Sequence, residues 1–414
     1  MRPDPDLALQ GLEEAVEARG WPTGISECRP SSEAALEVCA GPLGVQFRGR
    51  IQTSKRLMAL QQSAQPAALL LLVLLPLAAA RTVLRNRDGS CVMLPTASPW
   101  HQDVSAWPVY SRSASVVDII GADTRFHADF SGGEEVSGRM IHYGIPINEV
   151  DTNPAKGQRF PANGAIVFDE SDDESDHGMY PFPLAAKVEG AWAGCDPDVC
   201  SGDRHVLVRD NHTCLLYEGY ACRAPSGMSG KWTCGSGAIF DLSSPKLIQR
   251  HVGWTSADAA GLPIWPGLIT ISDVLDKGVI DHAIRFTSDS LRTAYQYPAT
   301  HLTDGDNPAG PWMGMRARLR PTFNCGLLRT AAARVICRAL KKTGMILADG
   351  GSSWYLTGEA NPAWQARLGS SYDQFLTDIK AIKGSDVQVV VPPTGACLCD
   401  HAHAYNCDTT VCLL

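Results

Sequence analysis

A run of fourteen apolar residues, Ala67–Ala80, constrains this 414-residue chain more than any other local feature. It reads AALLLLVLLPLAAA and is shorter than the roughly 20 residues of a membrane-spanning helix. Its length is typical of a signal-peptide core, and its last three alanines form a small-residue cleavage site. We therefore expect a signal peptide at residues 58–80, cleavage before Arg81, and folding in an oxidising compartment.

The position of this run is unusual, because signal peptides begin at the N-terminus. A start at Met58 gives a leader of ordinary length, so residues 1–57 are predicted to be a non-native or disordered extension. The alternative is an uncleaved signal anchor, with Lys55 and Arg56 in its positive cytoplasmic flank. The sequence thus predicts a secreted or extracellular protein, with a single-pass membrane anchor as the alternative.

The cysteine content agrees with export. All but Cys28 and Cys39 of the 14 cysteines follow the apolar run, and an even number is typical of a disulfide-bonded protein. Two local pairs are plausible, Cys195 with Cys200 and Cys222 with Cys234. Asn211 begins the sequon Asn-His-Thr, so we predict that it is glycosylated.

The last residues, 396–414, form a Cys/His-rich tail. In a cytosolic protein this composition would suggest zinc, but in an exported protein disulfides are favoured. We therefore predict no metal and no cofactor. The residues concerned are Cys397, Cys399, His401, His403, Cys407 and Cys412.

Composition indicates many turns and short strands. The chain has 38 glycines and 27 prolines, and its net charge of −8 argues against nucleic acid as a partner. We expect a single β-rich globular domain at residues 81–395, of β-sandwich or jelly-roll type, with one or two short helices. Strands are predicted at 205–209, 214–218, 238–242, 283–287, 316–319, 345–348, 354–357 and 387–391, and helices at 328–342 and 372–382.

Much of the mature chain resembles a family of uncharacterised, mostly secreted proteins of bacteria and some eukaryotes. The resemblance implies export and carries no activity, and the chain departs from the family pattern in its extra cysteines and its tail. The similar stretches are Phe126–Phe130, Tyr143–Pro146, Gly202–Val208, Leu216–Glu218, Ser236–Leu242, Gly253–Ile264, Ile280–Thr287, Pro298–His301 and Gly344–Asp349.

The clearest hairpin supplies the first catalytic candidates. A turn at residues 210–213 would place His205 directly opposite Glu218, where an acid and a base could act together. The alternative is a cross-strand salt bridge. We add Asp258 and His301 as catalytic candidates, because His301 ends a predicted strand and Asp258 lies in a loop rich in small residues.

Aromatic and imidazole side chains are the candidates for substrate binding. Trp254 could stack on a sugar ring, and Tyr297 and His282 could line the same cleft as His301; Tyr143 is the fourth candidate. The acidic run at residues 169–176 lacks the spacing of a calcium loop and is expected to be a solvated surface loop.

No common esterase, metalloprotease or nucleotide-binding motif is present in the sequence. Export, 10 tryptophans and a His/Glu/Asp set lead us to expect a carbohydrate-active enzyme, a hydrolase or a lyase, acting on a polysaccharide or cell-wall glycan. The alternative is a non-catalytic glycan-binding or structural extracellular protein.

Overall fold

The structure is a computed structural model that describes residues 83–192, 202–246, 249–394, 396–400 and 412–413. The predicted extension, the signal peptide and the Cys195/Cys200 pair lie outside the described residues. Among the residues that are described, no helix is both long and apolar enough to cross a membrane.

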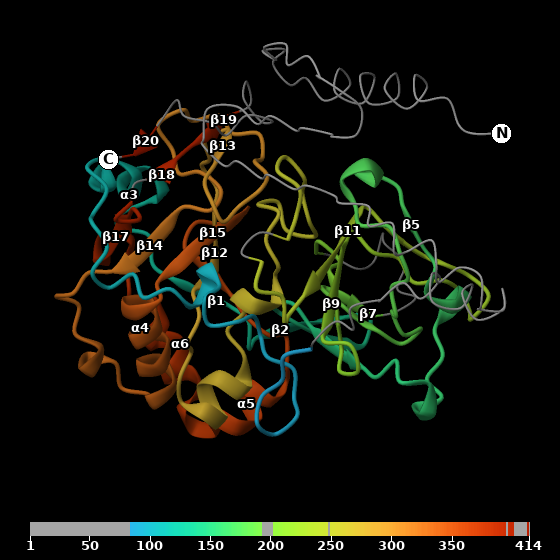
Figure 1. Cartoon of the computed structure of the whole chain (residues 1–414). Coiled ribbons are helices and arrows are strands. Elements are labelled where there is room, and N and C mark those ends of the chain that lie inside the picture. Colours follow the sequence, from blue (N-terminus) through green and yellow to red (C-terminus); the bar gives the residue numbers. More distant parts are fainter. Residues whose placement is uncertain (1–82, 193–201, 247–248, 395, 401–411, 414) are drawn as a thin grey trace, which may run out of the picture. The chain divides into compact units, whose positions relative to one another are not determined.

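A six-stranded mixed sheet forms the larger core (Figure 1). Its central strands β12 and β15 are parallel and almost wholly buried, as expected for strands that are covered on both faces. The strand order is β1 (His127–Asp129), β16 (Tyr355–Thr357), β12 (Ile284–Ser288), β15 (Met345–Gly350), β14 (Arg316–Leu319) and β17 (Val387–Val390).

Short helices pack against this sheet. Helix α4 contacts β14 and α6 contacts β1, while α3 contacts β17. Helix α4 has basic residues in its last turn and buries its apolar face, as its sequence spacing predicts. The helices are α3 (Ser113–Ile120), α4 (Ala331–Lys342), α5 (Ala363–Leu368) and α6 (Tyr372–Lys380), with a π-helical turn at Ser272–Lys277.

A four-stranded sheet forms a second group of strands, to the right in Figure 1. One face of it joins the main core, and the other packs on a smaller aromatic cluster that includes Tyr180, Phe182 and Trp232. The strand order is β11 (Ser236–Asp241), β9 (Leu215–Tyr220), β8 (Val206–Asp210) and β4 (Ile147–Val150).

Five two-stranded pairs complete the strands of the described residues. The expectation of a β-rich chain with few helices is confirmed, whereas the sheet order does not establish a sandwich or a jelly roll. The pairs are β2 (Gly133–Val136) with β3 (Arg139–His142), β5 (Ile166–Phe168) with β10 (Trp232–Cys234), β6 (Lys187–Val188) with β7 (Ala191–Trp192), β13 (Ala294–Tyr295) with β19 (Cys399–Asp400), and β18 (Ala396–Cys397) with β20 (Cys412–Leu413).

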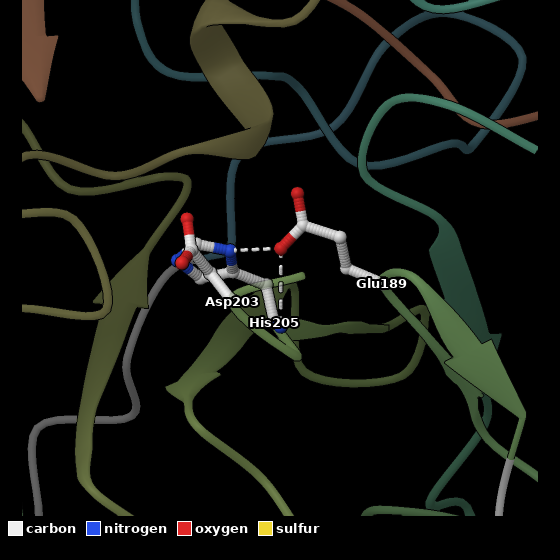
Figure 2. Close-up of side chains that lie close together, drawn as sticks. All are labelled: Glu189, Asp203 and His205. Carbon is white, nitrogen blue, oxygen red and sulfur yellow. Dashed lines mark hydrogen bonds and ion pairs between the residues drawn. The ribbon is translucent and has the colours of Figure 1, made fainter. Parts of the chain in front are cut away.

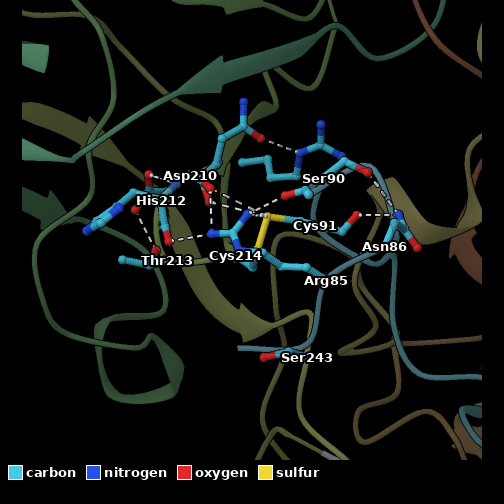
Figure 3. The surroundings of a disulfide bond; sticks show 12 residues. Arg85, Asn86, Ser90, Cys91, Asp210, His212, Thr213, Cys214 and Ser243 are labelled. Atoms are coloured by element: carbon cyan, nitrogen blue, oxygen red, sulfur yellow. Dashed lines mark hydrogen bonds between the residues drawn. A yellow bond between two sulfur atoms is a disulfide. The ribbon is translucent and has the colours of Figure 1, made fainter. Parts of the chain in front are cut away.

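Three disulfides join pairs of described cysteines. Cys222–Cys234 confirms a predicted pair, and Cys325–Cys337 links α4 to the segment before it. The third, Cys91–Cys214, joins residues 123 apart in sequence and fixes the β8–β9 turn to the first described segment (Figure 3). Cys399 in the tail is also disulfide-bonded, in agreement with the prediction of disulfides there.

Candidate functional site

A polar cavity of about 560 Å³ lies where one end of the four-stranded sheet meets the end of β15. Its size suits a small ligand or one or two sugar rings. Hydroxyl groups and carboxylates dominate its wall, and no Lys or Arg is among the described residues that line it. Those residues are Glu170, Ser171, Asp203, Tyr220, Ser236, Thr255, Ser256, Ala257, Ala259, His301, Leu302, Thr303, Asp304, Asp349 and Gly350.

Asp349 reaches the cavity because β15 is irregular. Arg285 is level with Ile346, and Thr287 is level with Asp349, so the register shifts by one residue between them. In a regular ladder Asp349 would be level with Ser288 and its side chain would lie on the opposite face. The bulge instead turns the carboxylate to the face of Arg285.

The buried guanidinium of Arg285 donates hydrogen bonds to two acidic side chains beneath the cavity, Asp258 and Asp349. Arg285, whose side chain is 4% exposed, donates from Nε and Nη2 to Asp258 at 3.0 and 2.8 Å, and from Nη2 to Asp349 at 2.7 Å. Asp258 is fully buried, whereas the side chain of Asp349 keeps 22% of its surface exposed. Two ionised carboxylates would therefore leave one buried negative charge uncompensated.

A proton on Asp349 relieves this imbalance. Burial is the largest cause and raises the pKa of Asp349 to about 7; the attraction of Arg285 opposes this rise, and repulsion from Asp258 adds to it. Asp349 is thus poised to change protonation near neutral pH. Asp203 lies on the wall of the same cavity and is exposed to solvent, so the cavity holds two carboxyl groups in different surroundings.

A second ion pair lies under Asp203. Nδ1 of His205 is 2.5 Å from Oε2 of Glu189, which belongs to the turn between β6 and β7 (Figure 2). Nε2 of His205 lies 2.8 Å from the carbonyl of Ala257, which can only accept a hydrogen bond. Burial opposes the charge on His205, but Glu189 outweighs it and raises the pKa of His205 to about 9. The imidazolium therefore uses both N–H groups within the protein.

Glu189, Asp203 and His205 have the spacing of a metal site, with ligand atoms within 4.8 Å of one another. Two ligands of one ion at about 2.0–2.2 Å from it lie roughly 3 Å apart. The 2.5 Å contact between Nδ1 and Oε2 is closer than that and is the distance of a shared proton. The group is therefore built as an ion pair beside an exposed carboxylate.

The predicted hairpin register is wrong by two residues. Leu207, not His205, is level with Glu218, and the turn spans residues 211–214. The carboxylate of Glu218 is fully buried and accepts the backbone N–H groups of Ile264 and Trp265 at 2.8 and 2.9 Å. Burial raises the pKa of Glu218 to about 7, although these two donors oppose the rise. Glu218 thus anchors a loop and does not face the cavity.

The loop at residues 253–264 is the floor of the cavity on one side. Ser236 Oγ donates to the Ser256 carbonyl, and Ser256 Oγ donates to the Leu262 carbonyl. Gly261 has a φ of +71°, and a Cβ there would lie 2.1 Å from Oγ1 of Thr300, so only glycine fits. The small residues of this loop therefore serve close packing, which in turn places Ser256 and Ala257 against the cavity.

The structure places the four catalytic candidates in two groups. His205, Glu218 and Asp258 converge under the 253–264 loop and are buried, each bonded within the protein. His301 lines the cavity, with Nδ1 2.9 Å from the Ala259 carbonyl and Nε2 3.7 Å from Glu174. Only His301 could touch a ligand in the cavity as the side chains stand.

The other candidates lie away from this cavity. Trp254 packs against Arg250 and His251, and Tyr297 lines a different cavity. His282 is buried beside Asp273, with 3.6 Å between Nε2 and Oδ2, and Tyr143 is exposed on the surface. None of these four is among the residues that line the polar cavity.

Two further sequence predictions concern surface segments. The amide nitrogen of Asn211 donates to Glu149 at 3.0 Å, and the amide oxygen accepts from Arg209 at 3.1 Å. Glycosylation of Asn211 remains a prediction, and a glycan on the nitrogen would replace the hydrogen bond to Glu149.

The acidic run at residues 169–176 is less solvated than expected. Asp176 forms an ion pair with buried Arg250, and Glu174 accepts the backbone N–H of Thr255.

Sequence reasoning missed Glu189, Asp203, Tyr220 and Asp349 as site residues. With the observed register, Tyr220 lies level with His205, and Asp203 precedes His205 by two residues. Their closeness to His205 is the one sequence signal that could have identified these two residues as part of the site. The pairing of Asp349 with Arg285 had no local signal in the sequence.

No family model, no curated protein and no solved structure matches this chain.

Proposed function

We propose that this protein is a glycoside hydrolase in which Asp349 is the general acid and Asp203 the second carboxylate. The observation that carries the proposal is the presence of two cavity carboxyl groups with different electrostatic surroundings. Glycoside hydrolysis needs one protonated carboxyl group for the leaving oxygen and one carboxylate as nucleophile or base. Burial raises the pKa of Asp349 and so favours the proton there, whereas Asp203 is exposed to solvent on the wall of the same cavity.

The ion pairs beneath the cavity would position these two groups. Arg285 holds Asp349, and the β12–β15 bulge aims it. His205 and Glu189 support the segment that carries Asp203, and we assign His205 a positioning role because both its ring nitrogens are bonded. The hydroxyl groups of the wall could hydrogen-bond a sugar, and Tyr220 could pack on its face.

The charge of the cavity favours a hydrolase over a lyase. A lyase that acts on uronic acids needs a cation near the substrate carboxylate, whereas the described wall has no Lys or Arg and carries four acidic side chains, which does not suit a negatively charged substrate. The acidic residues are Glu170, Asp203, Asp304 and Asp349. The substrate we propose is therefore a neutral or amino-sugar glycan. Action outside the cell belongs to this proposal and is supported by the disulfides.

A panel of neutral, amino-sugar and uronic-acid polysaccharides tests the proposal. We expect new reducing ends from a neutral or amino-sugar glycan, and none of the ultraviolet absorbance of the unsaturated sugar that a lyase makes. Binding without any cleavage would favour the non-catalytic glycan-binding alternative. Cleavage of uronic-acid polymers alone, with that absorbance, would contradict the hydrolase and its charge selection.

A further inference from the structure

A second cavity, of about 530 Å³, lies between β13, the start of β14 and the segment after β17. Its lining is different from that of the polar cavity, since aromatic rings and prolines form half of it. It contains the exposed ring of Tyr297 and the half-buried ring of Trp107. The lining residues are Gln102, Asp103, Trp107, Gln296, Tyr297, Pro298, Arg316, Pro392, Pro393 and Thr394.

Arg316 lies at the wall of this cavity as a buried cation that has no counter-charge among the described side chains. The residue is 1% exposed, and its Nη1 and Nη2 donate to the carbonyls of Pro99 and Thr343 at 2.9 and 2.8 Å. Its Nε finds no partner among the described residues, and none of their carboxylates forms an ion pair with it. Burial lowers the pKa of Arg316 to about 9, which is the cost of an uncompensated charge.

Gln296 presents a second unsatisfied donor at the same wall. It is 1% exposed, and its Oε1 accepts from Nε1 of Trp312 at 2.9 Å, which fixes the orientation of the amide. Its Nε2 has no partner among the described residues. Buried donors without partners are rare in native proteins, and two at one cavity indicate that an acceptor belongs there.

We infer that this cavity binds a small carboxylate whose ring has a flat apolar face. The carboxylate would supply the counter-charge of Arg316, and it would accept from the Arg316 and Gln296 donors once these side chains, which neighbouring atoms cover, shift toward the cavity. Trp107, whose ring centroid is 5.5 Å from the Arg316 guanidinium, and Tyr297 would pack on the face of the ligand. Asp103 lines the cavity too, but its carboxylate accepts the backbone N–H of Ser105 at 2.9 Å.

Two kinds of molecule share this chemistry, aromatic acids and acidic sugars. This inference is independent of the proposed function, because none of the residues of this cavity lines the polar one. Calorimetric titration of the full chain with benzoate and with glucuronate separates the two sources. Benzamide, which has the shape of benzoate without its charge, is the ligand control.

We expect benzoate or glucuronate to bind, benzamide to bind at least tenfold more weakly than benzoate, and Arg316→Met to weaken binding at least tenfold. Arg316 is buried, so the variant could fail to fold. Tyr297→Ala then decides, because it should weaken the binding of the same acid by about fivefold or more. Its matched control is Tyr143→Ala, since Tyr143 is 44% exposed against 38% for Tyr297 and lines neither cavity.

Each outcome decides for or against the site. Binding of either acid, lost in the Arg316→Met or Tyr297→Ala variant and kept in Tyr143→Ala, supports it. Equal binding of benzoate and benzamide would show that the cavity does not recognise the carboxylate charge, and would overturn the inference. Absence of binding by both acids would mean that only water satisfies the two donors, and would overturn the inference.

Discussion

Replacing Asp349 by asparagine is expected to lower kcat on a cleaved glycan by about 100- to 10,000-fold, the usual contribution of a general acid. Asparagine keeps the shape of the side chain and can still accept from Arg285, so folding should be preserved. The measurement is the steady-state rate of reducing-end release, together with a thermal melt of each protein.

The control for this substitution is Asp281→Asn, because the side chain of Asp281 is 73% exposed and lies outside the cavity. It should change kcat by less than about twofold, as expected for a surface substitution. An Asp349→Asn protein that melts normally and keeps the wild-type rate would remove Asp349 from the mechanism. The hydrolase would then need another acid, and His301 would be the next residue to test.

Replacing Arg285 by methionine should destabilise the fold by about 3–5 kcal/mol, because it leaves a fully buried carboxylate without its partner. Asp258 is 0% exposed and receives two hydrogen bonds from Arg285 that no other described side chain supplies. The free energy of unfolding from denaturant titration measures the loss.

The matched control is Arg367→Met. Arg367 pairs with Asp276 at 2.7 Å, but the two side chains are 41% and 54% exposed. Such an exposed pair is screened by solvent and contributes far less to stability than the buried pair of Arg285. Equal losses in the two variants would mean that Asp258 is not buried as an ionised group, and the electrostatic account of Asp349 would lose its basis.

Local patterns in the sequence predicted the longer elements, although they missed many of the short strands. The strands at 316–319 and 345–348 and the helix ending at Lys342 agree with β14, β15 and α4 to within a few residues. Their signals are strong because alternation and helical spacing depend on near neighbours alone. The order of the strands in the sheets depends on distant pairings and could not be predicted in this way.

The hairpin shows where local reasoning fails. Asp210 was assigned to the turn, since aspartate favours turns. In the structure it ends β8, and its carboxylate accepts from Thr152, which is 58 residues away, and from His212 and Thr213 in the turn. The disulfide of Cys214 adds a second distant constraint. Both fix the register from outside the hairpin.

The candidate site was predicted only in part for the same reason. His205, Asp258 and His301 do lie in or under the polar cavity, but Asp349 was not among the predicted site residues. Its role depends on a one-residue bulge against β12 and on an arginine 64 residues earlier in the chain. Neither is visible in the sequence around Asp349.

The dependence of kcat/KM on pH tests the central claim most directly. Asp349 must be protonated to act as the acid, and its pKa is raised to about 7, so activity is available below that pH and is lost above it. Measured on the glycan that the panel identifies, kcat/KM should fall about tenfold for each pH unit beyond about 7. A rate that stays constant or rises between neutral and alkaline pH, as expected for base-catalysed elimination, would contradict the account.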